Sequence, residues 1–366
     1  MPPFSAADHA FMAEALRLAE HGLFTTAPNP RVGCVIVNQG RLVGAGWHAR
    51  AGEPHAEVHA LREAGQHAAG ATVYVTLEPC SHHGRTPPCA EALIAAGVTR
   101  VVAAMQDPDP RVAGSGLAML ASAGIETATG LMEAQARQIN PGFVSRMTRG
   151  RPWVTLKAGA SLDGRTALAN GASKWITGAA ARSDVQRQRA RSCAVLTGIG
   201  TVLADDPQLN VRELETGRQP LRVVADSRLR IPAGARMLEG GRVLVATAEA
   251  GAAVREALQA AGAEVLQLPD ACGRVDLSAL LRALAQREIN ELMVEAGPQL
   301  NGALLGAGLV DELLIYLAPS LLGDTARGLF ALPAFAALSQ RINLDIVALD
   351  RVGADLRIRA RPLPPI

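Results

Sequence analysis

The sequence predicts an α/β fold made of two consecutive α/β domains. The chain has 366 residues, enough for two domains that each bury a core of their own. Short runs rich in Val, Ile and Leu alternate with helical patterns, which is typical of sheets covered by helices on both faces. This alternation breaks around residues 147–152, so we expect domains of 1–150 and 151–366.

Cap and turn signals separate the elements expected in the first domain. Ser5-Ala6-Ala7-Asp8 has the form of a capping box and predicts a helix that ends near Gly22. Asn38-Gln39-Gly40 predicts a turn between two strands, and a helix is expected between Pro88 and Gly97. Strands are expected at 32–37, 42–47, 72–77, 101–104 and briefly at 125, and further helices near 55 and over 117–123.

In the second domain, several polar segments follow expected strands and precede helical patterns. Residues 197–201 and 295–298 could each hold a phosphate through backbone N–H groups, although each by itself is more typical of a structural loop. A Rossmann fingerprint is absent, because Leu203 stands where the third glycine is needed. Strands are expected at 153–158, 194–196, 221–224, 243–246, 292–295 and 313–317.

Composition argues against several classes of protein. A net charge of +2 and 3% aromatic residues are weak support for nucleic-acid binding. No run of 18 apolar residues predicts a membrane span, and the N-terminus does not read as a signal peptide. The odd count of five cysteines indicates a reducing compartment. We therefore expect a cytoplasmic protein without nucleic-acid or membrane partners.

Three residues spread along the first domain are candidate zinc ligands: His55, Cys80 and Cys89. Three protein ligands leave the fourth tetrahedral position to water, whose pKa zinc lowers toward neutrality. Glu57 is two residues from His55 and is left free to transfer protons. A His-x-Glu followed by Pro-Cys-x-x-Cys is the signature of zinc-dependent nucleobase deaminases.

The cysteine spacing departs from that signature, because eight residues rather than two separate Cys80 from Cys89. Gly84 and Pro87-Pro88 favour a fixed loop that returns Cys89 to the metal near a helix N-terminus, where thiolate is favoured. The alternatives are two buried free thiols or a structural zinc site. A structural site would take its fourth ligand from His59, His82 or His83.

The chain resembles the bifunctional riboflavin-biosynthesis deaminase/reductase (RibD) family over roughly residues 11–359. The specific strings of the first domain are 28–33, 55–60 and 76–89, and the eight-residue spacing is this family's own form. Segments 157–164, 175–177, 201–207 and 295–298 resemble the reductase half. The resemblance implies a cytidine-deaminase-like three-layer α/β/α domain followed by an α/β domain similar to dihydrofolate reductase.

The resemblance also implies two consecutive reactions. The first deaminates 2,5-diamino-6-(5-phosphoribosylamino)pyrimidin-4(3H)-one to 5-amino-6-(5-phosphoribosylamino)uracil with zinc, and the second reduces the ribosyl side chain to ribityl with NADPH. Glu57 would shuttle protons, and Asn29 would orient the pyrimidine. His82 and His83 would lie near the substrate or behind the ligands. The implied partner is this small phosphorylated substrate, and a homo-oligomer, dimer or tetramer, is expected.

Site residues of the reductase half are carried over position by position. The NADPH positions match Gly159, Trp175, Thr201, Asp205, Ser227, Gly297, Pro298, Gln299, Leu300, Asn301, Gly302 and Ala303. The substrate positions match Ser173, Arg189, Leu209, Arg212 and Glu295. Arg189 and Arg212 suit a clamp on the substrate phosphate, and Ser227 with Arg228 suits a 2′-phosphate. Lys174 and Ala296 depart from many relatives.

Two rival functions stay open at this point. One is a nucleic-acid deaminase whose second domain binds RNA, against which the weak net charge and scarce aromatic residues argue. The other is a binding or scaffold protein in which one domain has lost its chemistry. The complete set of His55, Glu57, Cys80 and Cys89 argues against a dead deaminase.

Overall fold

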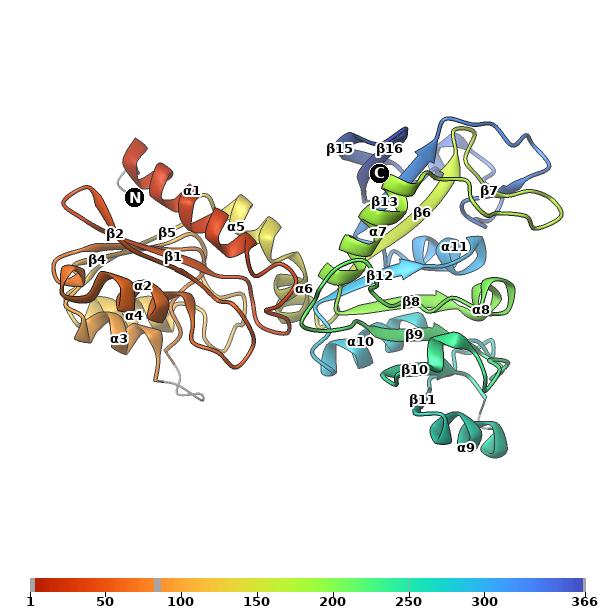
Figure 1. Cartoon of the computed structure of the whole chain (residues 1–366), viewed down its shortest axis with the longest axis horizontal. Helices are drawn as coiled ribbons and strands as arrows, with labels where there is room; N and C mark the ends of the chain where they lie inside the picture. The colour runs from red at the N-terminus through yellow and green to blue at the C-terminus, as the bar shows by residue number, and fades with distance from the viewer. Residues whose placement is uncertain (1–3, 82–86, 250, 365–366) are drawn as a thin grey trace. The chain divides into compact units, whose positions relative to one another are not determined.

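The computed structural model describes residues 4–81, 87–249 and 251–364. The chain divides into two compact units, Met1–Arg151 and Pro152–Ile366, a division one residue from the expected boundary. Each unit alternates helices and strands, and the predicted α/β class is confirmed (Figure 1). Across the described residues, no helix is both long and apolar enough to cross a membrane.

The first unit is built on a five-stranded sheet with the order β2-β1-β3-β4-β5. Its strands are β1 (Gly33–Asn38), β2 (Arg41–Trp47), β3 (Thr72–Val75), β4 (Arg100–Ala103) and β5 (Glu126–Thr129). β1 is antiparallel to both β2 and β3, whereas β3, β4 and β5 run parallel. The expected strands are confirmed, except that the last begins at Glu126, after the predicted Ile125.

Helices cover both faces of this sheet, which makes the unit three-layered. One face carries α2 (Ala56–Ala64), α3 (Cys89–Ala95) and α4 (Ser115–Ser122), and the other carries α1 (Ala6–Glu20), α5 (Glu133–Ile139) and α6 (Pro141–Arg149). Alternate residues of each strand enter the two cores: Ile36 and Val73 face α2, whereas Val35 and Tyr74 face α1.

Two glycines of β2 allow α2 to lie unusually close to the sheet. A Cβ on Gly44 would meet the carbonyl oxygen of Ala60 at 2.2 Å, and one on Gly46 would meet that of Ala56 at 2.5 Å. Any side chain at these positions would therefore push the helix away. Because His55 and Glu57 lie at the N-terminus of α2, this contact positions two of the predicted deaminase residues.

The second unit is built on a nine-stranded sheet with the order β11-β10-β9-β8-β12-β6-β13-β16-β15. The strands from β11 to β13 run parallel, and β16 and β15 add an antiparallel hairpin. The parallel strands are β6 (Trp153–Ser161), β8 (Ala194–Gly198), β9 (Leu221–Ala225), β10 (Val243–Thr247), β11 (Ala263–Gln267), β12 (Glu291–Glu295) and β13 (Glu312–Ala318). The hairpin is β15 (Leu344–Val352) and β16 (Asp355–Pro362), and β7 (Arg165–Ala167) pairs with β14 (Arg327–Gly328) apart from the main sheet.

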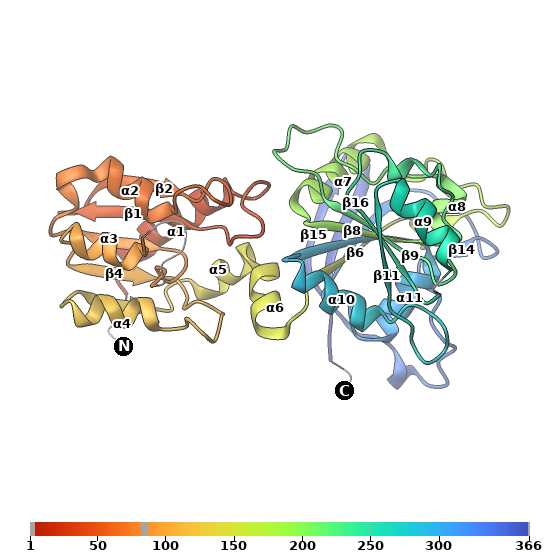
Figure 2. The same cartoon turned by 90° about the horizontal axis from the view of Figure 1, so that it is seen from below.

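Five helices cover the two faces of this sheet. α7 (Ala179–Arg191), α8 (Ile199–Asp205) and α9 (Ala252–Ala260) share one core cluster with inward residues of β8, β9, β10, β12 and β13. α10 (Leu277–Gln286) and α11 (Pro298–Gly306) contribute no residue to that cluster, and Figure 2 shows them on the opposite side of the sheet.

The sequence predictions missed the strands that carry weak hydrophobic patterns. β7, β11, β14, β15 and β16 were not expected. In β16, arginines alternate with apolar residues, and each of these arginines has a partner that lies elsewhere in the chain. Arg357 pairs with Asp184, Arg359 pairs with Glu312, and Arg361 lies over the ring of Trp153.

Asp8 ties α1 to the sheet of the first unit. The predicted capping box is confirmed, with the Asp8 amide donating to Ser5 Oγ at 3.1 Å and the Ser5 amide donating to Asp8 Oδ2 at 2.8 Å. Tyr74 and Arg100 both donate to Asp8 Oδ1 at 2.7 Å. Burial raises the pKa of Asp8, but these hydrogen bonds together outweigh it and hold the pKa well below its usual range.

We expect Asp8→Asn to destabilise the first unit by about 1–3 kcal/mol at pH 7, because Arg100 and Tyr74 lose a charged acceptor. The folded-state pKa is depressed, so this contribution is present above the unfolded-state pKa and fades as the pH falls toward the folded-state pKa. The loss should therefore shrink between about pH 5 and pH 2.

Urea unfolding over this pH range, assigned to the first unit by hydrogen exchange of its strand amides, measures the effect. Glu20→Gln removes an exposed carboxylate at the end of α1 and serves as the control. An equal stability loss in Asp8→Asn at pH 7 and pH 3 would contradict the prediction.

Candidate functional site

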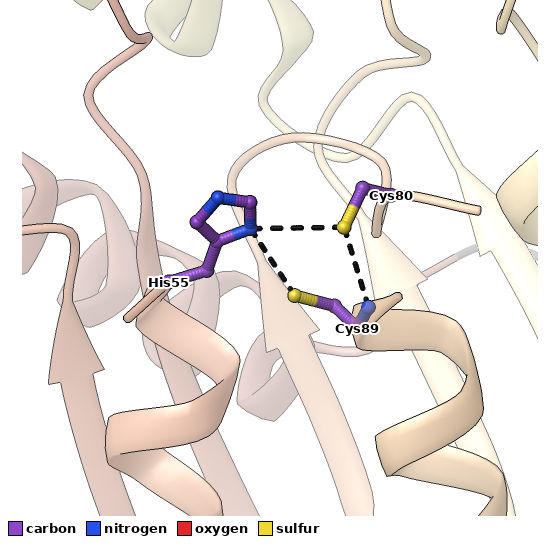
Figure 3. Close-up of side chains that lie close together, drawn as sticks. All are labelled: His55, Cys80 and Cys89. Carbon is purple, nitrogen blue, oxygen red and sulfur yellow. Dashed lines mark hydrogen bonds between the residues drawn. The ribbon is translucent and has the colours of Figure 1, made fainter. Parts of the chain in front are cut away.

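Three side chains from three elements converge just beyond the carboxyl end of β3. His55 is the N-cap of α2, Cys80 follows β3, and Cys89 is the first residue of α3, as the sequence predicted. The Nδ1 atom of His55 lies 3.3 Å from Sγ of Cys89 and 3.6 Å from Sγ of Cys80. Figure 3 shows the imidazole nitrogen and both sulfurs pointing toward one another.

This donor set fits a zinc ion. With Zn–S and Zn–N bonds of about 2.3 and 2.0 Å, tetrahedral ligand atoms lie roughly 3.5–3.8 Å apart, close to the separations found here. Among the described residues, this is the single group of three or more His, Cys, Asp or Glu donors within 4.8 Å of one another. His59 lies outside the group, and His82 and His83 fall outside the described residues.

The two thiols differ in acidity. The hydrogen bond from Cys89, supported by His55, lowers the pKa of Cys80, and the Cys89 backbone amide also donates to Cys80 Sγ at 3.3 Å. The hydrogen bond between the two thiols raises the pKa of Cys89, and its burial raises that pKa further. The hydrogen bond between Cys80 and His55 raises the pKa of His55. The three donor groups therefore interact with one another at the position where a bound metal would replace their protons.

Glu57 lies in the first turn of α2 and is almost fully buried. Burial raises the pKa of its carboxyl, and the charge of His55 only partly opposes this effect. A carboxyl with a raised pKa takes up a proton more readily than an ordinary one and can release it again, which suits general acid–base catalysis. The position agrees with the predicted proton shuttle, two residues from a metal ligand.

Glu78 anchors the segment that delivers Cys80. Its buried carboxylate accepts four backbone N–H groups, from Asp107, Gly114, Gly116 and Leu117, at 2.8–3.3 Å. Three of these donors lie at the start of α4, where helix amides lack partners of their own. Glu78 lies in a segment that resembles the family, but the sequence alone indicates no role for it, because its hydrogen-bond partners lie at least 29 residues away along the chain.

Gly116 completes this anchor by letting the start of α4 touch the Glu78-Pro79-Cys80 segment. A Cβ at Gly116 would lie 1.9 Å from the carbonyl oxygen of Pro79. The close approach therefore requires glycine, and no other residue could sit there without moving Pro79.

Asn29, the residue predicted to orient the pyrimidine, is separated from the metal ligand His55 by the side chain of His48. Its Nδ2 atom is 3.1 Å from Nε2 of His48, and the His48 ring meets the His55 ring edge-on, with centroids 5.3 Å apart. Sequence reasoning did not single out His48. A lone histidine after β2 carries no signal until the fold places it beside His55.

The predicted reductase residues gather at the carboxyl ends of parallel strands of the second unit. Thr201 lies 3.8 Å from the Cβ position of Gly297, and Leu300 lies 3.6 Å from that of Gly198. These contacts join the end of β8 and the start of α8 to the start of α11. Such crevices at strand ends are the usual ligand sites of open α/β sheets.

The segment between β7 and α7 also reaches toward α8. Lys174 Nζ is 3.2 Å from Asp205 Oδ1, and Thr177 contacts the Cβ position of Gly159 at 3.3 Å. Trp175 is 71% exposed, and the guanidinium of Arg182 lies 4.8 Å from its ring centroid. Three predicted cofactor residues, Gly159, Trp175 and Asp205, therefore lie within this one segment or next to it.

The start of α11 fits a dinucleotide. The Oδ1 atom of Asn301 is buried without a hydrogen-bond partner among the described residues, while its Nδ2 donates to Ala296. Gly297 is the N-cap, and Pro298, Gln299, Leu300 and Ala303 lie in the first two turns. Gly302 has a structural role, because a Cβ there would lie 2.2 Å from the carbonyl oxygen of Ala331.

Glu295 lies between two cations. Arg189 on α7 donates from Nε to Glu295 Oε1 at 2.5 Å and from Nη2 to Oε2 at 3.0 Å, and Lys157 Nζ lies 3.8 Å from Oε2. Burial raises the pKa of Glu295, but Arg189 and Lys157 outweigh it and hold that pKa below its usual range. Lys157 begins segment 157–164, which resembles the family's reductase half, but the sequence alone indicated no role for it.

Arg189 and Arg212, the two arginines predicted to clamp the substrate phosphate, are neighbours, but the guanidinium of Arg189 makes more hydrogen bonds within the protein than that of its neighbour does. Arg189 also donates to the carbonyl oxygen of Asn210, and Arg212 donates to Asn210 Oδ1, both at 3.1 Å. The Nε and Nη2 atoms of Arg189 both donate to Glu295. A substrate phosphate beside Arg189 could therefore bind only the N–H groups of the guanidinium that do not face Glu295. Arg212 is exposed and presents its guanidinium at the surface.

The remaining predicted residues lie in loops around the same unit. Ser227 follows β9, and its Oγ accepts from the Val275 amide at 3.1 Å, while the adjacent Arg228 is exposed. Leu209 is buried with a φ of 54°, and Ser173 precedes the Lys174–Asp205 pair.

Comparisons with known proteins match both units. The family model described as the RibD C-terminal domain matches residues 152–358, and the cytidine and deoxycytidylate deaminase zinc-binding region matches residues 5–105. The riboflavin biosynthesis protein RibD of Escherichia coli is 53% identical over 363 residues, covering 95% of this chain and 98% of the relative. That of Haemophilus influenzae is 49% identical over 381 residues, covering 99% of each.

Solved structures agree. Acinetobacter baumannii RibD, form 1, has a TM-score of 0.92 at 47% identity, covering 98% of this chain and 99% of that one. The deaminase/reductase of Thermotoga maritima has a TM-score of 0.87 at 33% identity, with the same coverage. Its description names a diaminohydroxyphosphoribosylaminopyrimidine deaminase and 5-amino-6-(5-phosphoribosylamino)uracil reductase.

We expect about one zinc ion per chain and the loss of most of it in Cys89→Ser, because a neutral hydroxyl replaces a thiolate. Metal analysis by mass spectrometry after dialysis measures this content. Cys272→Ser changes an exposed thiol of the second unit and should keep full zinc. Full occupancy in Cys89→Ser would overturn the ligand assignment.

Proposed function

The chain belongs to the RibD family, and we propose that it carries out both reactions named for its Thermotoga maritima relative, deamination of the diaminopyrimidine and reduction of the phosphoribosylaminouracil. The observation that carries this proposal is the group of His55, Cys80 and Cys89 beside the buried carboxyl of Glu57. We assign the deaminase to the first unit and the reductase to the second, because the two family models match them separately.

In the deaminase, His55, Cys80 and Cys89 would hold zinc, which supplies a water of lowered pKa when it is bound. Glu57 accepts a proton from the attacking water and passes it to the ring nitrogen, and it then transfers the proton of the added hydroxyl to the amino group, which departs as ammonia. Its burial keeps bulk water from competing for these protons. Asn29 orients the pyrimidine through its carboxamide.

In the reductase, NADPH supplies a hydride, and the residues of the second unit bind and orient the two reactants. The backbone amides at the start of α11, with Thr201 beside them, suit the cofactor's pyrophosphate. Ser227 and the exposed Arg228 suit its 2′-phosphate.

Glu295 and Arg212 bind the other reactant. Arg189 and Lys157 keep Glu295 ionised, so its carboxylate can accept hydrogen bonds from ribosyl hydroxyls. The exposed guanidinium of Arg212 suits the substrate phosphate better than that of Arg189, whose fork already holds Glu295.

A reducing compartment suits this chemistry. Cys80 and Cys89 must be thiolates rather than a disulfide to bind a metal, and both are free in the structure. This requirement supports the proposal that the chain works in the cytoplasm. The proposed partner is the small phosphorylated pyrimidine, not a nucleic acid.

Glu57→Gln should release ammonia from the diaminopyrimidine about two to four orders of magnitude more slowly, because the amide cannot shuttle protons. Its zinc content and its NADPH-dependent reduction of supplied uracil intermediate should stay unchanged. Ammonia release and loss of NADPH absorbance measure the two reactions separately, and wild-type chain should show both.

Glu53→Gln is the matched control, since it removes an exposed carboxylate just before α2. Near-normal ammonia release by Glu57→Gln would show that Glu57 is not the shuttle. Loss of both reactions in the folded variant would mean that the two sites are coupled.

We also propose that the chain forms a homo-oligomer through one face of the neighbouring strands β13, β16 and β15. The pairing registers place seven exposed or half-buried aliphatic side chains on this face: Ile315, Leu317, Leu344, Ile346, Leu349, Leu356 and Ile358. Ile346 and Leu349 are 63% and 62% exposed. The opposite face meets α7, where Asp184 binds Tyr316 and Arg357. An apolar patch of this kind on an edge hairpin favours contact with a second copy.

Ile346→Asp combined with Leu349→Asp should shift the chain to a monomer, because two charges enter the apolar face. Light scattering after size-exclusion chromatography measures the mass. Val254→Asp, on the exposed side of α9, should leave the oligomer intact. A monomeric wild type, or an unchanged mass in the double variant, would contradict the proposal.

A further inference from the structure

His48 is a buried histidine at the deaminase site to which neither the metal centre nor the proton shuttle assigns a role. It follows β2 and is 2% exposed. Its backbone amide donates to Val32 at 2.9 Å, which fixes the main chain beside the start of β1. Both ring nitrogens have partners: Nδ1 lies 3.2 Å from the carbonyl oxygen of Pro54, and Nε2 lies 3.1 Å from Nδ2 of Asn29.

These partners determine which ring nitrogen carries the proton. A carbonyl oxygen can only accept, so Nδ1 of His48 is the donor toward Pro54. In a neutral imidazole the other nitrogen then bears a lone pair, so Nε2 accepts a hydrogen bond from the NH₂ group of Asn29.

The consequence is a fixed orientation of the Asn29 carboxamide. The backbone N–H of Asn29 donates to the carbonyl oxygen of Thr26 at 2.9 Å. Pro28 and Pro30 flank Asn29, so the main chain there has little conformational freedom. If the side chain were flipped, Oδ1 would face the lone pair of His48 Nε2, which is repulsive. With Nδ2 held by His48, Asn29 keeps Oδ1 and its second N–H for another partner.

We propose that His48 is a positioning residue for the deaminase: it holds the Asn29 carboxamide so that its oxygen accepts an N–H of the pyrimidine. This inference rests on the proposed function, in which Asn29 binds that ring. The ligand class it selects is a heterocycle with an N–H or amino donor on the edge that meets Asn29.

A purely structural role for His48 predicts something different. The contact with Pro54 and the packing against His55 would satisfy a core histidine, and either would support the fold whatever occupied position 29. A positioning role instead requires that the effect of changing His48 depend on Asn29.

Two substitutions separate the two ring nitrogens. In His48→Asn the amide can replace Nδ1 and keep the Pro54 contact, but it leaves Asn29 without an acceptor. In His48→Gln the longer amide can place its oxygen where Nε2 was, which keeps the acceptor for Asn29. His67→Asn, at an exposed histidine of the first unit, is the control.

The test measures ammonia release from the diaminopyrimidine as kcat/KM for the zinc-loaded full chain, with zinc content and melting temperature recorded for each variant. We expect His48→Asn to lower kcat/KM about tenfold, the scale of one hydrogen bond, with zinc retained. His48→Gln should recover most of this loss. In an Asn29→Ala background, His48→Asn should cause little further change.

Three results would overturn the inference. If His48→Asn matches wild type while Asn29→Ala impairs deamination, then Asn29 binds substrate without help and only this inference fails. Equal losses from His48→Asn with and without Asn29 would assign His48 an independent role. If Asn29→Ala leaves kcat/KM unchanged in a chain that deaminates, then the substrate assignment of Asn29 fails together with the inference, while the deaminase itself stands.

Discussion

The deaminase site depends on one buried carboxylate, that of Glu78. A charge without partners would be too costly to bury, but four backbone amides satisfy this one. Those amides come from the segment that leads into α4, so a single side chain joins the end of β3 to a helix more than 35 residues later. Cys80 follows two residues after Glu78, and its position is therefore set by the body of the sheet rather than by a free loop.

The same principle places the other two ligands. His55 is set by α2, which glycines allow to pack closely on β2, and Cys89 is set as the first residue of α3. The long connection between the cysteines does not have to hold the metal geometry, because its ends are attached to rigid elements on both sides. This explains how eight intervening residues can bring the second thiol back to 3.3 Å from the imidazole.

In the second unit, a buried carboxylate is stabilised by cationic side chains instead of backbone amides. Its site contains a buried carboxylate, Glu295, between Arg189 and Lys157. Burying three charged groups is favourable only when each is paired, so the removal of any one would leave its neighbours uncompensated. Both units place their reactive groups at the carboxyl ends of parallel strands, where the loops are free to vary while the sheet holds the spacing.

Hydrophobic patterns predicted the central strands of both sheets, because these strands are buried on two faces and read as continuous apolar runs. They could not predict β15 and β16. In β16, arginines alternate with apolar residues, and such a strand is stable only because acidic partners come from α7, β13 and β15. In the reductase unit, the likeness to a known family supplied the site residues, since the loops themselves are too similar to ordinary turns.

The sequence by itself determined the metal chemistry of this protein. The order of an imidazole, a nearby carboxyl and two thiols indicated a zinc-dependent hydrolytic site, and the resemblance to a known family accounted for the eight residues between the thiols. Only the tertiary structure decided which polar groups support that site. The contacts of Glu78 with α4, of His48 with Asn29 and of Arg189 with Glu295 join residues 19–106 positions apart, and no local pattern specifies such pairs. They form because a buried polar group must find a partner, and the fold determines which partner is within reach.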